Sequence, residues 1–185
     1  MARLRPEFET ALRLFAQASA LVTAQGFEAP ILVGGGAVEL FTNSALMTGD
    51  FDVSTARQAE FEQALRSLGF VKPSGPGVAT RGWMHPDLKF GFEVVSSTLL
   101  DGLAERDRIK MLDLDDDGVA AIISVEDMIA DRMGQFASGA APEMWEQARR
   151  LLILHSDVDR AYLDRRIREE TAGDYGIQDA HSRPA

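Results

Sequence analysis

The large apolar residues of the first 25 positions recur with the period of an α-helix. Four of them lie at intervals of four, three and seven, namely Phe8, Leu12, Phe15 and Val22. This spacing places their side chains on one face of a helix. Pro6 suits the first helical position, and Gly26 is typical of a helix end. The pattern therefore predicts a helix over residues 6–25.

The pattern then changes to a short apolar run that ends in glycines. The stretch APILVGGG, residues 29–36, predicts a buried strand and a tight turn, and AVELFTNSA predicts a short helix after it. In DFDVS, residues 50–54, acidic and apolar side chains alternate, as in a strand with one face in the core. Residues 55–69 return to helical spacing, and Gly69 follows their last apolar residue.

The second half of the chain predicts strands first and helices afterwards. A turn-rich segment, residues 71–82, precedes the alternating stretch LKFGFEVVSS, which predicts a strand. The stretch RIKMLDLDDDGVAAIIS predicts a hairpin that turns at residues 116–118. Ser124 and Asp127 then form the pattern of a helix capping box. Three helices are expected, over residues 124–137, 142–155 and 157–170.

The order of these elements, α-β-α-β-α-β-β-β-α-α-α, predicts a mixed α/β (α+β) fold. We expect a small mixed sheet flanked by helices in a core of residues 1–124. Residues 125–170 are expected to form a helical C-terminal part that packs on this core. The polar residues 171–185 are expected to be a flexible tail.

Composition limits the classes of protein that this chain can represent. Its 185 residues contain no cysteine, which excludes disulfide scaffolds, thiolate zinc sites and cysteine nucleophiles. No apolar run reaches the roughly 18 residues of a membrane span, and the N-terminus does not resemble a secretory signal. We therefore expect a cytoplasmic protein without a membrane partner. The net charge of −10 argues against a broad surface for duplex nucleic acid.

The glycines and the D-x-D pair form the strongest chemical pattern in the sequence. Gly34 and Gly35 join a strand to a helix, where free backbone N–H groups favour a bound phosphate. Asp50 and Asp52 share one face of the next strand, because alternate residues of a strand point the same way. Two neighbouring carboxylates repel each other unless a cation lies between them, and Mg²⁺ prefers such oxygen ligands. A tight turn and an exposed strand end are the structural alternatives.

A two-metal site requires a further carboxylate from a neighbouring strand. Glu93 is the first candidate, because it is a charged residue between apolar neighbours in FGFEVV. Asp87, in the preceding turn, is the second candidate. Phosphate binding beside a carboxylate set is the arrangement that phosphoryl transfer requires.

An apolar strand, Gly-Gly, a short helix and D-x-D resemble the nucleotidyltransferase superfamily with the polymerase-beta-type fold. The form VGGGAV…TGDFDV looks most like AbiEii-like abortive-infection toxins and related small bacterial nucleotidyltransferases. The residues that carry this resemblance are Gly34, Gly35, Gly36, Ala37, Val38 and Thr48. The later segment SVEDMIADRMGQF also resembles the family. There Arg132 stands at the position of a basic residue that faces the nucleotide. The resemblance covers roughly residues 28–155.

The resemblance implies an enzyme, a nucleotidyltransferase that depends on Mg²⁺ in a one- or two-metal site and uses an NTP such as ATP. Asp50, Asp52 and Glu93 would be the catalytic and metal-binding residues. The nucleotide would be bound by Gly34, Gly35, Thr48 and Arg132. The sequence departs from the family at Leu46 and Met47, where a basic residue often precedes the hydroxyl residue, and at Glu93, which is usually Asp.

Two further stretches have simpler interpretations. DLDDDG, residues 113–118, matches the first half of a calcium loop, but Ser124 stands where the bidentate Glu is needed. A hairpin turn is the better interpretation. Trp83 and His85 could contact a base, although packing at the core or its rim explains both.

Three functions therefore remain open at the level of sequence. The first is the transfer of an NMP from an NTP to a hydroxyl of an unidentified RNA, protein or small molecule. The second is a catalytically degenerate binding or regulatory protein, such as a toxin–antitoxin component. The third is an enzyme of the aminoglycoside nucleotidyltransferase type. A partner protein and a homo-oligomer are both compatible with the sequence.

Overall fold

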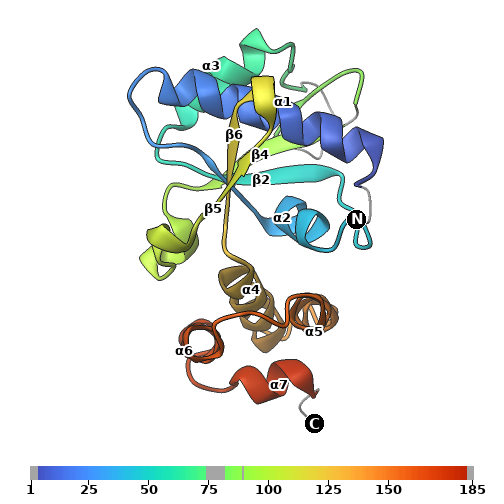
Figure 1. Cartoon of the computed structure of the whole chain (residues 1–185), viewed down its shortest axis with the longest axis vertical. Coiled ribbons are helices and arrows are strands. Elements are labelled where there is room, and N and C mark those ends of the chain that lie inside the picture. The colour runs from blue at the N-terminus through green and yellow to red at the C-terminus, as the bar shows by residue number, and fades with distance from the viewer. Residues whose placement is uncertain (1–3, 74–81, 89, 183–185) are drawn as a thin grey trace. The chain divides into compact units, whose positions relative to one another are not determined.

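The structure, a computed structural model, describes residues 4–73, 82–88 and 90–182 (Figure 1). Most of the turn-rich segment 71–82 therefore lies outside the described residues. The chain forms two compact units. Unit 1 comprises residues 1–99 and 109–122, and unit 2 comprises residues 100–108 and 123–185.

Unit 1 contains a six-stranded mixed sheet with the strand order β3-β4-β2-β1-β6-β5. Strand β1 is antiparallel to β2 and parallel to β6, and β2 is parallel to β4. The strands are β1 (Ile31–Val33), β2 (Asp50–Ser54), β3 (Trp83–Met84), β4 (Gly91–Ser96), β5 (Lys110–Asp113) and β6 (Val119–Ile122). The predicted mixed α/β fold with a flanked sheet is confirmed.

Helices cover both faces of this sheet. Helices α1 (Pro6–Thr23) and α3 (Gln58–Ser67) lie over one face, and α2 (Gly34–Phe41) lies on the other (Figure 1). The prediction of a glycine turn before α2 was wrong in one respect. Strand β1 runs directly into the helix, and the three glycines form its first turn.

An aromatic layer fills the space between α1 and the sheet. The rings of Phe51 and Phe92 stack with centroids 4.8 Å apart, and Phe8 of α1 lies 5.2 Å from Phe51. These three side chains are fully buried. Burying a side chain of this size contributes about 1.5–3 kcal/mol. Because residues alternate along a strand, the neighbours of Phe51 and Phe92 point to the opposite face.

The predicted hairpin forms from β5 and β6, which are antiparallel with Asp113 opposite Val119. Its turn contains a short 3₁₀ segment, η3 (Asp115–Asp117), and Gly118 with a φ of +98°. The Asp117 carboxylate accepts hydrogen bonds from Arg13 (2.8 Å) and Gln17 (2.6 Å) on α1. The acidic stretch DLDDDG is therefore a turn anchored to a helix.

Unit 2 is helical. It contains α4 (Val125–Ala137), α5 (Met144–Leu154), α6 (Arg160–Glu170) and α7 (Ile177–His181), together with η2 (Arg106–Arg108) and most of η1 (Leu99–Gly102). The Ser124 hydroxyl caps α4 by accepting from the Asp127 N–H at 3.0 Å, as the sequence predicted. Within the stretch expected to be a tail, Ile177 and Ala180 of α7 are buried.

A buried charged network ties α4 to α6. Arg166 is fully buried, and its Nε donates to the Asp127 carboxylate at 2.8 Å. The Tyr162 hydroxyl also donates to Asp127, at 2.9 Å. Burial, together with the Asp127 charge, raises the pKa of Tyr162 to about 12. At neutral pH the phenol therefore stays protonated and keeps this hydrogen bond.

Candidate functional site

Gly34 and Asp52 occupy the same small volume where β1 passes into α2. Val33 pairs with Asp52 across the antiparallel strands, so the next residue lies beside the carboxylate. A Cβ atom added to Gly34 would be 2.0 Å from Asp52 Oδ2, and its φ of +58° is left-handed. The sequence assigned this glycine to phosphate binding. The structure shows that the Asp52 side chain itself requires it.

Gly35 has the same relation to Thr48. A Cβ atom on Gly35 would lie 2.7 Å from Thr48 Oγ1, and the Gly35 N–H donates to Asp52 Oδ2 at 3.3 Å. The Thr48 hydroxyl donates in turn to Asp50 Oδ1 at 2.8 Å. The start of α2, the hydroxyl residue and both aspartates of D-x-D are thus joined in one contiguous set of contacts.

Glu93 joins this set through the register of two strands. In the parallel pair of β2 and β4, Asp52 is opposite Glu93 and Asp50 is opposite Gly91. Residues at paired positions of a sheet point to the same face. The carboxylates of Asp50, Asp52 and Glu93 therefore lie on the face opposite the aromatic layer. Asp87, the second candidate, is exposed in a turn between β3 and β4.

The donor chemistry of this face suits a hard divalent cation, because it offers three carboxylates and a hydroxyl. Asp50 is exposed, and Asp52 and Glu93 are half-buried. Within the described ranges, however, no three acidic or histidine side chains converge closely enough to form a metal-binding group. The backbone thus gathers the three acids on neighbouring strands, and a shared ligand position requires their side chains to turn toward one another.

This site has a second, buried part that the sequence did not indicate. Glu39 of α2 is fully buried and accepts hydrogen bonds from Arg5 Nε (2.6 Å), Arg5 Nη2 (2.9 Å), Ser44 Oγ (2.9 Å) and the Thr48 N–H (2.6 Å). Burial alone would raise the pKa of Glu39, but the Arg5, Thr48 and Ser44 donors outweigh it and lower the pKa. The available signal was an acid inside the apolar run AVELF.

Arg132 lies in unit 2, on α4. It is 5% exposed, and its Nη1 donates to Asp131 Oδ2 at 3.0 Å. Its Nε is buried and has no hydrogen-bond partner within the described part of the chain. Because Arg132 and the three acids belong to different units, its predicted contact with the nucleotide stays a prediction.

Trp83 and His85 line the rim of unit 1. The His85 ring packs against Phe70 with centroids 5.1 Å apart, which agrees with the packing interpretation. A hollow of about 390 Å³ beside Trp83 is lined by residues of α3, β3 and β4, including Gln58 and Glu93, and by Lys72 of the segment that follows α3. It includes both Phe92 and Glu93, whose side chains point to opposite faces. The hollow therefore lies at the edge of the sheet.

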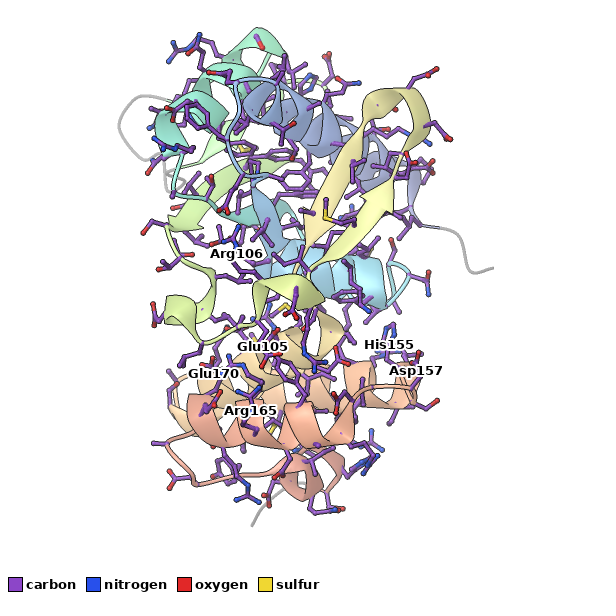
Figure 2. All side chains as sticks on the ribbon, turned by 60° about the vertical axis from the view of Figure 1, so that its left-hand side comes forward. Glu105, Arg106, His155, Asp157, Arg165 and Glu170 are labelled. Atoms are coloured by element: carbon purple, nitrogen blue, oxygen red, sulfur yellow. The ribbon has the colours of Figure 1, made fainter. Side chains whose placement is uncertain are left out.

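A surface cluster of charges surrounds Tyr162 in unit 2. Glu105 accepts from Arg165 at 2.5 Å (Figure 2). It also accepts from Arg108 at 2.8 Å. The guanidinium of Arg108 also lies 3.8 Å from the centre of the Tyr162 ring. These contacts hold residues 100–108 within unit 2. Each arginine has an acidic partner here, so the cluster is not an open basic patch.

The sequence matches no protein-family model and no curated protein. Among the solved structures that share its fold are the following two. An antigenic nucleotidyltransferase-like protein from Paracoccidioides brasiliensis is 13% identical, with a TM-score of 0.57 over 97% of this chain and 94% of that chain. The antibiotic-resistance factor ANT(2'')-Ia, whose conformational dynamics are described as substrate-regulated, is also 13% identical, with a TM-score of 0.56 over 89% and 92%.

The polypeptide therefore has a nucleotidyltransferase fold. Both matches span most of each chain and include residues of both units. None of the helices in the described ranges combines the length and the hydropathy that a bilayer crossing requires.

Proposed function

We propose that the protein is a Mg²⁺-dependent nucleotidyltransferase that moves an NMP from an NTP to a hydroxyl group of an acceptor. One observation carries the proposal. Asp50, Asp52 and Glu93 lie on one sheet face, with Asp52 opposite Glu93, beside the N-terminus of α2 and the Thr48 hydroxyl. The shared fold supports it. The nearer likeness to AbiEii-like proteins rests on the sequence motif alone.

The roles of the residues follow from their chemistry. The N–H groups of the first turn of α2 that are not bonded to Asp52, together with the positive end of the helix dipole, would face the triphosphate. Asp50 and Asp52 would hold Mg²⁺, with Glu93 as the third ligand. The bound metal would offset the triphosphate charge and acidify the acceptor hydroxyl. Thr48 would fix Asp50 through the hydrogen bond between its hydroxyl and Asp50 Oδ1.

The reaction forms one bond and breaks one. The acceptor oxygen attacks the α-phosphorus, the bond between that phosphorus and the oxygen bridging to the β-phosphorus breaks, and pyrophosphate leaves. Glu93 takes the proton of the acceptor hydroxyl. The products are an NMP ester of the acceptor and pyrophosphate.

The direct test uses radiolabelled NTPs, Mg²⁺ and acceptors of three classes: total RNA, protein extract and an aminoglycoside. We expect label transfer by the wild type and a loss of at least about 100-fold in Asp50→Asn. Asp116→Asn is the matched control, because it removes one exposed acid from the hairpin turn of the same unit. Equal transfer by the wild type and Asp50→Asn would exclude the assignment.

A catalytically degenerate regulatory protein is the second candidate. Two observations favour it: the described carboxylates do not converge as they stand, and the basic residue expected before Thr48 is absent. Isothermal titration with ATP discriminates the two functions. Mg²⁺-dependent ATP binding supports the enzyme, and a lack of ATP binding at millimolar concentration supports the regulatory protein.

A further inference from the structure

The first half of the loop that carries Thr48 is held by a turn of its own, in which the Ala45 N–H donates to the Thr42 carbonyl and the Leu46 N–H donates to the Thr42 hydroxyl. Residues 42–49 connect α2 to β2, and Asn43 and Ser44 adopt left-handed φ values of +49° and +60°. Such values are uncommon for residues other than glycine. Met47 is 73% exposed and so contributes little packing. Thr48 lies beyond that turn, and the groups that bond its N–H and its carbonyl come from outside the loop.

Those contacts come from one buried acid. Glu39 is the only charged residue of α2, and both of its carboxylate oxygens are used. Its Oε2 accepts from the Thr48 N–H at 2.6 Å, and its Oε1 accepts from the Ser44 hydroxyl at 2.9 Å. The acid thus holds the loop at its middle and at its end.

The other side of the loop is held by the beginning of the chain. The Arg5 guanidinium forms a bidentate pair with Glu39 and also donates, through Nη2, to the carbonyl of Thr48. The Arg5 N–H donates to Ser44 Oγ at 3.1 Å. Thr48 is therefore fixed at both its N–H and its carbonyl, which leaves its hydroxyl for Asp50.

We infer that Arg5 and Glu39 form a clamp that positions Thr48, and through it Asp50, for metal binding. The inference rests on the proposed function, because it assigns positioning residues to that same site. A planar guanidinium is needed, because the same group must donate two N–H bonds to the Glu39 carboxylate and a further one to the Thr48 carbonyl. The positions directly before Thr48, Leu46 and Met47, are apolar, so the cation comes from a segment 43 residues away.

The test compares the same substitution at two arginines of unit 1. Arg5→Lys keeps the charge but loses the planar fork, and Arg13→Lys does the same at the Glu9 and Asp117 pairs, away from Thr48. The double variant Arg5→Gln/Glu39→Gln removes both charges, so no buried charge remains unpaired. Two readouts are used: amide exchange of Thr48 by NMR in metal-free protein, and Mn²⁺ affinity by calorimetry.

We expect Arg5→Lys and the double variant to accelerate Thr48 amide exchange and to weaken Mn²⁺ binding about 10-fold. Arg13→Lys should change neither. If the role of Arg5 were merely structural, Arg5→Lys would lower the melting temperature without a specific change in Thr48 amide exchange and Mn²⁺ affinity. Unchanged exchange and unchanged Mn²⁺ affinity in the double variant would overturn the inference. The double variant also decides the question if Arg5→Lys does not fold.

Asp50→Asn separates this inference from the proposed function. If Asp50→Asn abolishes Mn²⁺ binding while the clamp variants leave it unchanged, only the clamp is excluded. If Asp50→Asn leaves Mn²⁺ binding unchanged, the proposed metal site fails, and the clamp is then judged by Thr48 exchange alone.

Discussion

Gly34 shows how a single residue limits the candidate site. A methyl group on Gly34 has no room, because Asp52 Oδ2 would be 2.0 Å from the added carbon. The aspartate cannot simply turn away, since its Oδ2 accepts the Gly35 N–H. The glycine that the sequence assigned to a ligand is thus already required by the protein's own carboxylate.

Gly34→Ala should therefore destabilise unit 1 by more than its backbone strain explains. Gly26→Ala is the matched control, because Gly26 has a φ of +84° and nothing within 4 Å of an added Cβ. We expect the free energy of unfolding to fall by about 1 kcal/mol in the control and by at least about 2 kcal/mol in Gly34→Ala, as measured by urea unfolding. Equal losses in the two variants would show that Asp52 moves without cost.

Glu39 also predicts a dependence of stability on pH. Its pKa in the folded protein lies below the ordinary value of 4.5, because the Arg5, Thr48 and Ser44 donors outweigh burial. Its contribution to the free energy of unfolding is therefore complete well above pH 4.5, and it is lost as pH falls through the lowered folded pKa.

Urea unfolding of the wild type and Glu39→Gln between pH 7 and pH 3 measures this contribution. The stability difference between the two should be constant near neutrality and should shrink in the acid range. Glu39→Gln serves as the non-ionising reference, because glutamine has nearly the same shape as glutamate and carries no ionisable group. A difference that is independent of pH would contradict the ionised clamp.

At the scale of elements, the sequence predicted most of the fold because its signals are local. Alternation in DFDVS and FGFEVV, and helical spacing in residues 6–25, each lie within one element. The sequence also placed the strand of Glu93 beside the strand of Asp50 and Asp52, which are the paired strands β4 and β2, but it did not predict that the two are parallel. The two-residue strand β3 and the helix α7 were missed, because two to five residues are too few for a period to appear.

The clamp was missed for a different reason. Arg5 and Glu39 are 34 residues apart, and no local pattern relates a residue before one helix to an acid within the next. Arg5 also stands among charged residues at the N-terminus, where a solvated side chain is the ordinary expectation. Contacts of this kind depend on how α1 and α2 lie on the sheet of unit 1.

At the scale of the whole molecule, the chain does not divide at one point. The sequence suggested a boundary after residue 124, whereas residues 100–108 belong to unit 2 although they precede β5 and β6 of unit 1. The partners of this segment, Asp159, Tyr162 and Arg165, lie about 50 to 60 residues later and could not be inferred from spacing.

A fragment of residues 1–124 should therefore contain a segment without its partners. In the full chain, Arg108 pairs with Glu105 and Asp159 and lies against Tyr162. We expect trypsin to cleave the fragment after Arg106 or Arg108 at least about 10-fold faster than the full chain, because local order protects backbone from proteolysis. Cleavage after Arg13 serves as the internal reference. If the rate of cleavage after Arg106 or Arg108, divided by the rate after Arg13, is the same in the fragment and the full chain, the expectation is contradicted.

The interleaving of the two units also limits how such a gene can change by recombination. A single breakpoint within residues 100–122 would always leave one unit incomplete, since the chain passes between the units after residues 99, 108 and 122. Exchanging the helical unit for another would require two insertions at once, one of them only nine residues long. We therefore expect the two units to be inherited together, so that such a protein would change through point substitutions rather than through domain shuffling.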